Sequence, residues 1–156
     1  MVNQYDLLLD IVIASFLSGL VGLERGLNEK PAGFRTHMIL GGSVALLVQM
    51  GQVIILRYQS INGLGQLQAD PIRIIQAIII GISFLGAGMV LQVKSEEKVK
   101  YLTSSATILL SAGIGLSVAL KQYVIAVGIT LLALFINYIL RMIIKWIRNY
   151  FLNKKN

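Results

Sequence analysis

The sequence predicts an all-α integral membrane protein, a bundle of five transmembrane helices with its N-terminus outside and its C-terminus in the cytoplasm. Of its 156 residues, 56% are hydrophobic and only 13% are charged, and the mean hydropathy is +0.75. Soluble domains carry charge on about a quarter of their residues. A soluble enzyme of this length would need a polar surface that this composition does not supply, so water is not the main solvent of the chain.

Five apolar runs are the second observation behind this fold class. Four neutral runs of 19 or 20 residues lie between charged residues, at 38–56, 74–93, 101–120 and 122–140. As a helix, such a run extends about 30 Å, which is the thickness of the hydrocarbon core of a bilayer. A shorter fifth run, 7–23, contains Asp10, and we expect it to be the first span. The sequence therefore predicts a membrane domain at 1–140 and a basic amphipathic cytoplasmic tail at 141–156.

The distribution of Lys and Arg sets the predicted orientation, because cytoplasmic loops keep positive charge. Eleven of the fourteen cations lie after the first run, after the third run or in the tail, and three lie in the other loops. The larger group comprises Arg25, Lys30, Arg35, Lys94, Lys98, Lys100, Arg141, Lys145, Arg148, Lys154 and Lys155, and the smaller comprises Arg57, Arg73 and Lys121. The acidic N-terminal segment lacks the basic start of a cleaved signal peptide, so we expect the first span to be retained.

Composition and motifs exclude several functional classes. The cations flank apolar runs and form no stripe on a soluble face, which favours anionic lipid headgroups over nucleic acid as the partner. The chain has no cysteine, so it has no thiolate metal site and no cysteine nucleophile. It shows no Gly-rich phosphate loop, no nucleophile beside a base and no paired-carboxylate signature, so we expect no catalysis.

Small residues at helical spacing predict close contacts between helices. They occur in the first run as Ala14, Ser15, Ser18, Gly19 and Gly22, in the third as Gly81, Gly86, Ala87 and Gly88, and in the fourth as Thr107, Ser111 and Gly115. Such residues let helix backbones approach each other, and packing is therefore the interpretation that we favour. The alternative is a thin place for an ion or a broken helix.

Ionisable side chains in or beside the apolar runs are the best candidates for function, because a charge within the membrane needs a partner. The predicted outer side carries a polar cluster of Asp6, Asp10, Asp70, Arg73 and Gln76. Asp10 and Arg73 lie at matching depths, which predicts an ion pair between the first and third spans. Asp70 followed by proline is also typical of a helix start. In the alternative, Asp10 serves as a proton or cation site, and Asp10 and Asp70 hold a hard cation such as Mg²⁺.

A charged segment between the first two runs supplies a second set of candidates, Glu24, Arg25, Lys30, Arg35, Thr36 and His37. We interpret this segment as a solvated loop that sets the topology, with His37 capping a helix or touching lipid headgroups. A single histidine without cysteine or an HExxH spacing is a poor transition-metal site.

Four stretches of the chain read, in order, GLERG, KPAGFRTHMILGGSVALL, ADPIRIIQAIIIGISFLGAGMVLQ and YLTSSATILLSAGIGLSVAL. Together they resemble the membrane domain of the MgtC/SapB family over residues 7–140. The resemblance implies a multi-pass protein of the bacterial inner membrane, linked to magnesium limitation and, in some members, to virulence and to acid or phosphate stress. It places the charged segment, Asp70, Arg73 and Gln76 in family blocks, without fixing their roles.

Two functions follow from the resemblance. The first is a noncatalytic regulator of other membrane machinery, with ATP synthase as one such partner; the second is a transporter or channel for magnesium or another cation. No cofactor is expected, with Mg²⁺ as the alternative ligand. Five spans give no internal inverted repeat, although a homodimer would supply one. Many relatives carry a soluble C-terminal regulatory domain, and because this chain ends shortly after its last span, we expect no sensing by such a domain.

Overall fold

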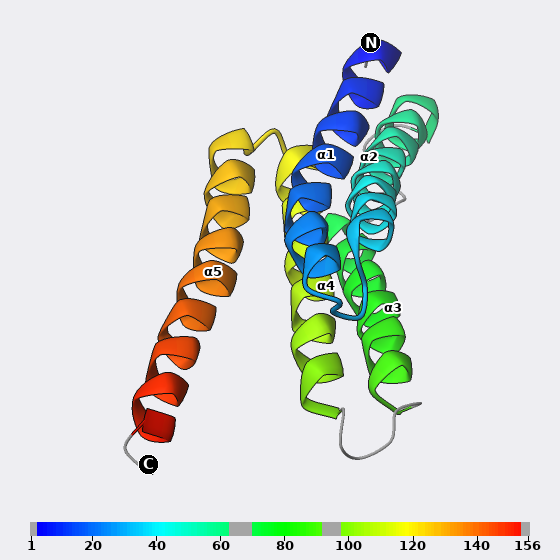
Figure 1. Ribbon diagram of the computed structural model, residues 1–156. Coiled ribbons are helices and arrows are strands. Elements are labelled where there is room, and N and C mark those ends of the chain that lie inside the picture. Colours follow the sequence, from blue (N-terminus) through cyan, green and yellow to red (C-terminus); the bar gives the residue numbers. More distant parts are fainter. Residues whose placement is uncertain (1–2, 63–69, 92–97, 154–156) are drawn as a thin grey trace.

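The computed structural model of the chain describes residues 3–62, 70–91 and 98–153. They form five α-helices: α1 (Gln4–Leu27), α2 (Phe34–Asn62), α3 (Pro71–Leu91), α4 (Lys98–Ala119) and α5 (Tyr123–Asn153). These described ranges contain no strand, which confirms the all-α prediction. Successive helices run in opposite directions, so the two termini lie at opposite ends of the bundle (Figure 1).

Within the described ranges, four helices are long and apolar enough to cross a membrane: α1, residues Phe34–Tyr58 of α2, α3, and residues Tyr101–Ala119 of α4. The fifth helix, α5, begins with a shorter apolar segment, Tyr123–Ile139, and continues as a helix to Asn153. The backbone of α5 therefore does not break at residue 140, and the boundary between membrane domain and tail stays a prediction. The orientation of the termini across the membrane also stays a prediction.

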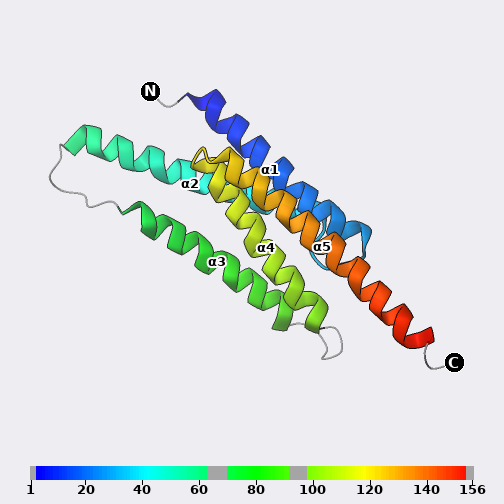
Figure 2. The ribbon, with the colours of Figure 1, turned by 90° about the vertical axis from the view of Figure 1, so that its left-hand side faces the viewer.

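The central helix of the bundle is α4, which contacts all four others. The most extensive pair is α1 with α2, and α3 packs mainly on α4 at the side opposite α5 (Figure 1). Figure 2 shows α5 running alongside α1, and α5 contacts only α1 and α4 in the described part of the chain. Helices α2 and α4 each contact both α1 and α3. Helices α1 and α3 do not contact each other within the described residues.

Small residues make the contact among α1, α2 and α4, as predicted for the first and fourth runs. A Cβ atom added to Gly19 would lie 2.6 Å from Cγ of Met38, and one added to Gly115 would overlap the carbonyl of Gly41. A larger side chain at Gly115 would force the backbones of α2 and α4 apart, and one at Gly19 would displace the side chains of Met38 and Phe34. The buried surfaces also include Ala14, Ser18, Gly22, Thr107 and Ser111, and Ser15 is half-buried.

For most of the third run the packing prediction is wrong. Gly86 does pack closely, because its carbonyl accepts a hydrogen bond from the hydroxyl of Ser105 at 2.6 Å. A Cβ atom added to Gly81 or Gly88 would meet nothing within 4 Å, and Ala87 is exposed. In α3 the buried residues are Ile82 and Gly86, so most of the small residues of this helix face open space.

Candidate functional site

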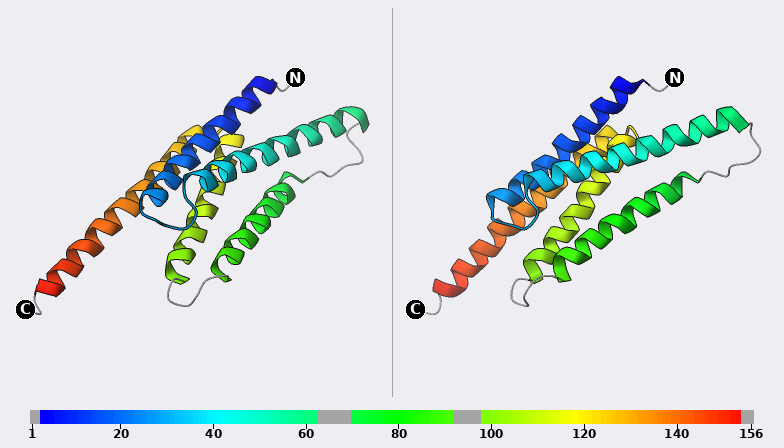
Figure 3. Two further views of the ribbon diagram at one scale, coloured as in Figure 1. Left: turned by 45° about the vertical axis from the view of Figure 1, so that its right-hand side comes forward. Right: turned by 90° about the vertical axis from the view of Figure 1, so that its right-hand side faces the viewer.

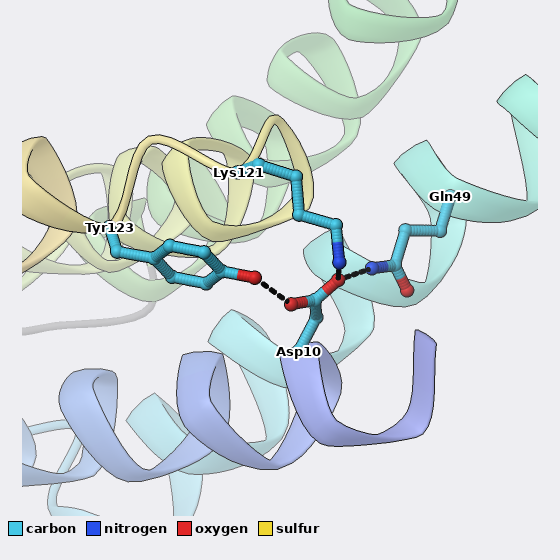
Figure 4. A network of polar contacts seen from close by, with 4 residues as sticks. All are labelled: Asp10, Gln49, Lys121 and Tyr123. Carbon is cyan, nitrogen blue, oxygen red and sulfur yellow. Dashed lines mark hydrogen bonds and ion pairs between the residues drawn. The ribbon is translucent and has the colours of Figure 1, made fainter. Parts of the chain in front are cut away.

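Asp10 is fully buried in α1 and lies at the centre of a polar network that joins α1, α2 and the α4–α5 turn (Figure 4). Its Oδ2 accepts from Nζ of Lys121 at 2.5 Å and from Nε2 of Gln49 at 2.6 Å. Its Oδ1 accepts from the hydroxyl of Tyr123 at 2.6 Å. Both carboxylate oxygens are therefore engaged, and the contact with Lys121 is an ion pair.

The α4–α5 turn brings Lys121 to Asp10 through its backbone conformation. Lys121 has a φ of 60°, its amide donates to the carbonyl of Val118, and the amide of Gln122 donates to the carbonyl of Ser117 at 2.8 Å. This is the pattern of a Schellman helix end, which is usually occupied by glycine at the left-handed position. The left-handed conformation destabilises a non-glycine residue by roughly 1 kcal/mol relative to glycine. The ion pair with Asp10 offsets this cost and joins the start of α5 to α1.

The charges of the network are balanced within it. The side chain of Lys121 is 51% exposed, whereas Asp10 is inaccessible, so the ammonium group approaches the buried carboxylate from the surface. The hydrogen bond to Asp10 raises the pKa of Lys121 above its ordinary value. A buried carboxylate is stable only when paired and hydrogen-bonded, and Asp10 meets both conditions.

The predicted outer polar cluster does not form around Asp10. Four of its five members, Asp6, Asp70, Arg73 and Gln76, are exposed. The predicted ion pair between Asp10 and Arg73 is wrong, because α2 and α4 separate the helices that carry them and the α4–α5 turn supplies Lys121 instead. The predicted helix start at Asp70 is confirmed, since its Oδ1 accepts from the amide of Ile72 at 2.9 Å.

A second buried polar cluster, the Arg25–His37 cluster, lies near the α1–α2 turn. Arg25 is 1% exposed, and its guanidinium donates to the hydroxyl of Ser104 in α4. His37 is fully buried, with Nδ1 2.6 Å from the hydroxyl of Ser111, whose carbonyl accepts from the hydroxyl of Ser18 at 3.3 Å. The prediction of a solvated loop with His37 at the headgroups is therefore wrong for these two residues, which join α1 and α2 to α4.

The other residues of the charged segment lie outside this cluster. Glu24 is partly buried, and its Oε1 accepts from Nδ2 of Asn28 at 3.0 Å. Lys30 is partly buried in the turn, and Arg35 and Thr36 are exposed in the first turn of α2. Of the six candidate residues in the charged segment, two therefore lie in the core and four lie nearer the surface.

Sequence reasoning overlooked Gln49 and Tyr123 and assigned Lys121 only to topology. Lys121 follows a neutral run directly and lies on the same predicted side as Asp10, which is the signal that could have paired them. Nothing in the sequence singles out Gln49 or Tyr123 in this way, because uncharged polar residues are common within and beside apolar runs.

A magnesium ion does not fit the residues at Asp10. Mg²⁺ binds carboxylate oxygens and retained waters, but here both oxygens accept from protein donors and one of these donors is an ammonium. Residues 3–62, 70–91 and 98–153 contain no group of three or more His, Asp or Glu side chains that could hold a metal ion.

Comparison with known proteins identifies the family. The model of the MgtC family matches residues 11–146. The chain belongs to the MgtC family. Among its MgtC-family relatives are SapB of Bacillus subtilis, 33% identical over 118 residues, which are 76% of this chain and 49% of SapB. MgtC of Salmonella typhimurium is 29% identical over 138 residues, which are 88% of this chain and 54% of that protein.

This MgtC-family chain spans about half the length of the curated relatives that it matches. YhiD of Escherichia coli, whose name describes it as a candidate magnesium transporter, is 28% identical over 118 residues, which are 76% of this chain and 53% of YhiD. No solved structure matches the chain. The family predicted from the sequence blocks is confirmed, and together with the apolar helices it makes the chain a multi-pass membrane protein.

Proposed function

We propose that this chain acts in the bacterial inner membrane as a noncatalytic regulator of other membrane machinery during adaptation to limiting magnesium. The names of YhiD and of its MgtC relatives support the link to magnesium. The observation that carries the proposal is the engagement of Asp10, the carboxylate buried in the first span, by Lys121, Gln49 and Tyr123. A carboxylate held in this way joins helices and is not open to a passing cation.

The remaining geometry also favours a regulator over a cation pathway. Close contacts of Gly19, Gly41 and Gly115 fill the space among α1, α2 and α4. A groove between α2 and α3 carries Arg35 and Arg73 in its lining, and these cations repel a divalent metal. Helix α3 exposes apolar side chains, among them Ile80, Phe84 and Leu91, which a partner within the membrane would cover. ATP synthase is the first candidate partner, on the resemblance of the sequence alone, and a homodimer is the alternative assembly.

Growth of a bacterial host that lacks its own family member tests the proposal. We expect the wild-type chain to restore growth in limiting magnesium, and the double variant Asp10→Asn/Lys121→Gln to restore it equally, because a neutral amide pair preserves the contact between α1 and the α4–α5 turn. Membrane levels of both proteins are matched by immunoblot. The proposal is contradicted if the wild-type chain does not restore growth. It is also contradicted if cells with the double variant, at an equal membrane level of protein, lose both growth and total cell magnesium.

A further inference from the structure

Side chains of α2 and α3 line a long apolar groove. Figure 3 shows α3 on the side of the bundle away from α5. Its volume is about 950 Å³, near the upper end of the roughly 300–1,000 Å³ typical of ligand sites. The floor is open at Gly81, where an added Cβ atom would meet nothing within 4 Å. Along α2 the groove extends from Arg35 to Leu47, which is about 18 Å of helix.

The dimensions of the groove match one acyl chain of a lipid. Half of the hydrocarbon core of a bilayer is about 15 Å thick, so the stretch of α2 that lines the groove is about as long as one leaflet is thick. Aliphatic side chains, among them Ile39, Leu47 and Leu85, form most of its lining. Apolar walls of this kind accept hydrocarbon but give no specificity for a headgroup.

Specificity comes from the end of the groove at the start of α2. Arg35 and Thr36 line this end, and both are exposed in the first turn of the helix, where the helix dipole is positive. Positive-inside topology places Arg35 on the cytoplasmic side, where anionic lipids gather. Arg73 lines the opposite end, which the predicted topology places toward the outer side of the membrane.

We propose that the α2–α3 groove binds an anionic phospholipid of the inner leaflet, with one acyl chain along the groove and the phosphate at Arg35 and Thr36. A second copy of the chain is a poorer occupant. The net charge of this chain is +7, and most of its cations belong to the predicted cytoplasmic side. Two copies meeting at this groove would bring like charges together, whereas an anionic lipid neutralises Arg35.

Native mass spectrometry of the purified chain in detergent tests the site with phosphatidylglycerol and phosphatidylcholine of the same acyl chains. We expect one lipid to be retained, with about fivefold preference for phosphatidylglycerol, the factor expected for one arginine at a membrane surface. Arg35→Gln should abolish the preference, and Arg73→Gln should keep it. Gly81→Phe should reduce retention of both lipids by filling the groove.

Gly128→Phe is the matched control for Gly81→Phe, because Gly128 lies in α5 and an added Cβ atom there also meets nothing within 4 Å. Circular dichroism on heating verifies that each variant is folded. Four results would overturn the proposal: equal retention of the two lipids by the wild type, a preference that survives Arg35→Gln, a preference lost in Arg73→Gln instead, or retention unchanged by Gly81→Phe. A dimer in detergent that Gly81→Phe dissociates would assign the groove to a second copy and would also overturn it.

Discussion

Separating Asp10 from Lys121 should destabilise the bundle unequally, depending on which partner is removed. Lys121→Gln leaves a buried carboxylate with only two neutral donors, whereas Asp10→Asn leaves an ammonium that is already half-exposed and can turn to solvent. The loss of a charge-assisted hydrogen bond costs about 1.5–3 kcal/mol, and breaking a fully buried ion pair costs about 3–5 kcal/mol. Because Lys121 is half-exposed, the range of a charge-assisted hydrogen bond applies, and we expect a loss of about 2 kcal/mol for Lys121→Gln. For Asp10→Asn we expect a loss of about 1 kcal/mol, since water can solvate the ammonium group that this change leaves without its partner.

A double-mutant cycle measures this coupling. Unfolding of the purified protein in mixed micelles is followed by circular dichroism as the fraction of sodium dodecyl sulfate is raised. The free energy lost in Asp10→Asn/Lys121→Gln should be smaller than the sum of the single losses by about 1 kcal/mol or more, as expected for residues in contact. The control cycle pairs Asp10→Asn with Arg73→Gln, and its effects should add. Additive effects at Lys121, or coupling at Arg73, would refute the geometry of the network.

Three further predictions follow from the fold. Gly19→Leu should lower the folded yield in detergent, by overpacking worth about 1–3 kcal/mol, whereas Val12→Leu at an exposed position of α1 should not; equal yields would mean that Gly19 faces lipid. Reporter fusions should give a cytoplasmic signal after Asn156 and an outside signal at Gly63, and a cytoplasmic signal at Gly63 would contradict the orientation. The raised pKa of Lys121 means that its stabilisation is complete below the unfolded value of about 10.4 and disappears as pH rises through the higher folded value. The stability difference between wild type and Lys121→Gln should therefore be constant from about pH 6 to pH 9 and shrink in stronger alkali; a difference that grew with pH would contradict the pair.

The helices and one contact surface were predictable because both depend on local properties of the chain. The lengths of neutral runs fix where helices can cross a membrane, and the spacing of Ser18, Gly19 and Gly22 marks one face of the first helix. That spacing does not say whether a neighbour is present. In α3 the same kind of residues, Gly81 and Gly88, face open space.

The partner of Asp10 was not predictable from depth alone. Arg73 and Lys121 both lie on the predicted outer side, and only the arrangement of helices separates them. Helix α1 packs on α4 and α5 but not on α3 within the described residues, so Lys121 is close and Arg73 is distant. Pairwise adjacency of helices depends on the whole bundle, which no single stretch of sequence encodes.

The burial of Arg25 and His37 was not predictable from the sequence, because their neighbours are charged. Charges at close spacing suggest a solvated loop, but α1 continues to Leu27 and α2 begins at Phe34, so both residues belong to helices. Their polar atoms then find Ser104 and Ser111 on α4, whose hydroxyls appeared in the sequence only as small packing residues. A serine in an apolar helix is a packing residue and a hydrogen-bond partner at once, and sequence spacing does not distinguish these roles.

Magnesium flux through the purified chain is the measurement that tests the central claim most directly. The protein is reconstituted into liposomes that contain a Mg²⁺-sensitive dye, and Mg²⁺ is added outside with a potassium gradient that sets the membrane potential. If Asp10 serves as a structural partner of Lys121 and the chain acts as a regulator, Mg²⁺ entry will equal that of liposomes without protein. Entry that rises with the amount of protein and is lost in Asp10→Asn would contradict the account and would assign Asp10 to a cation pathway.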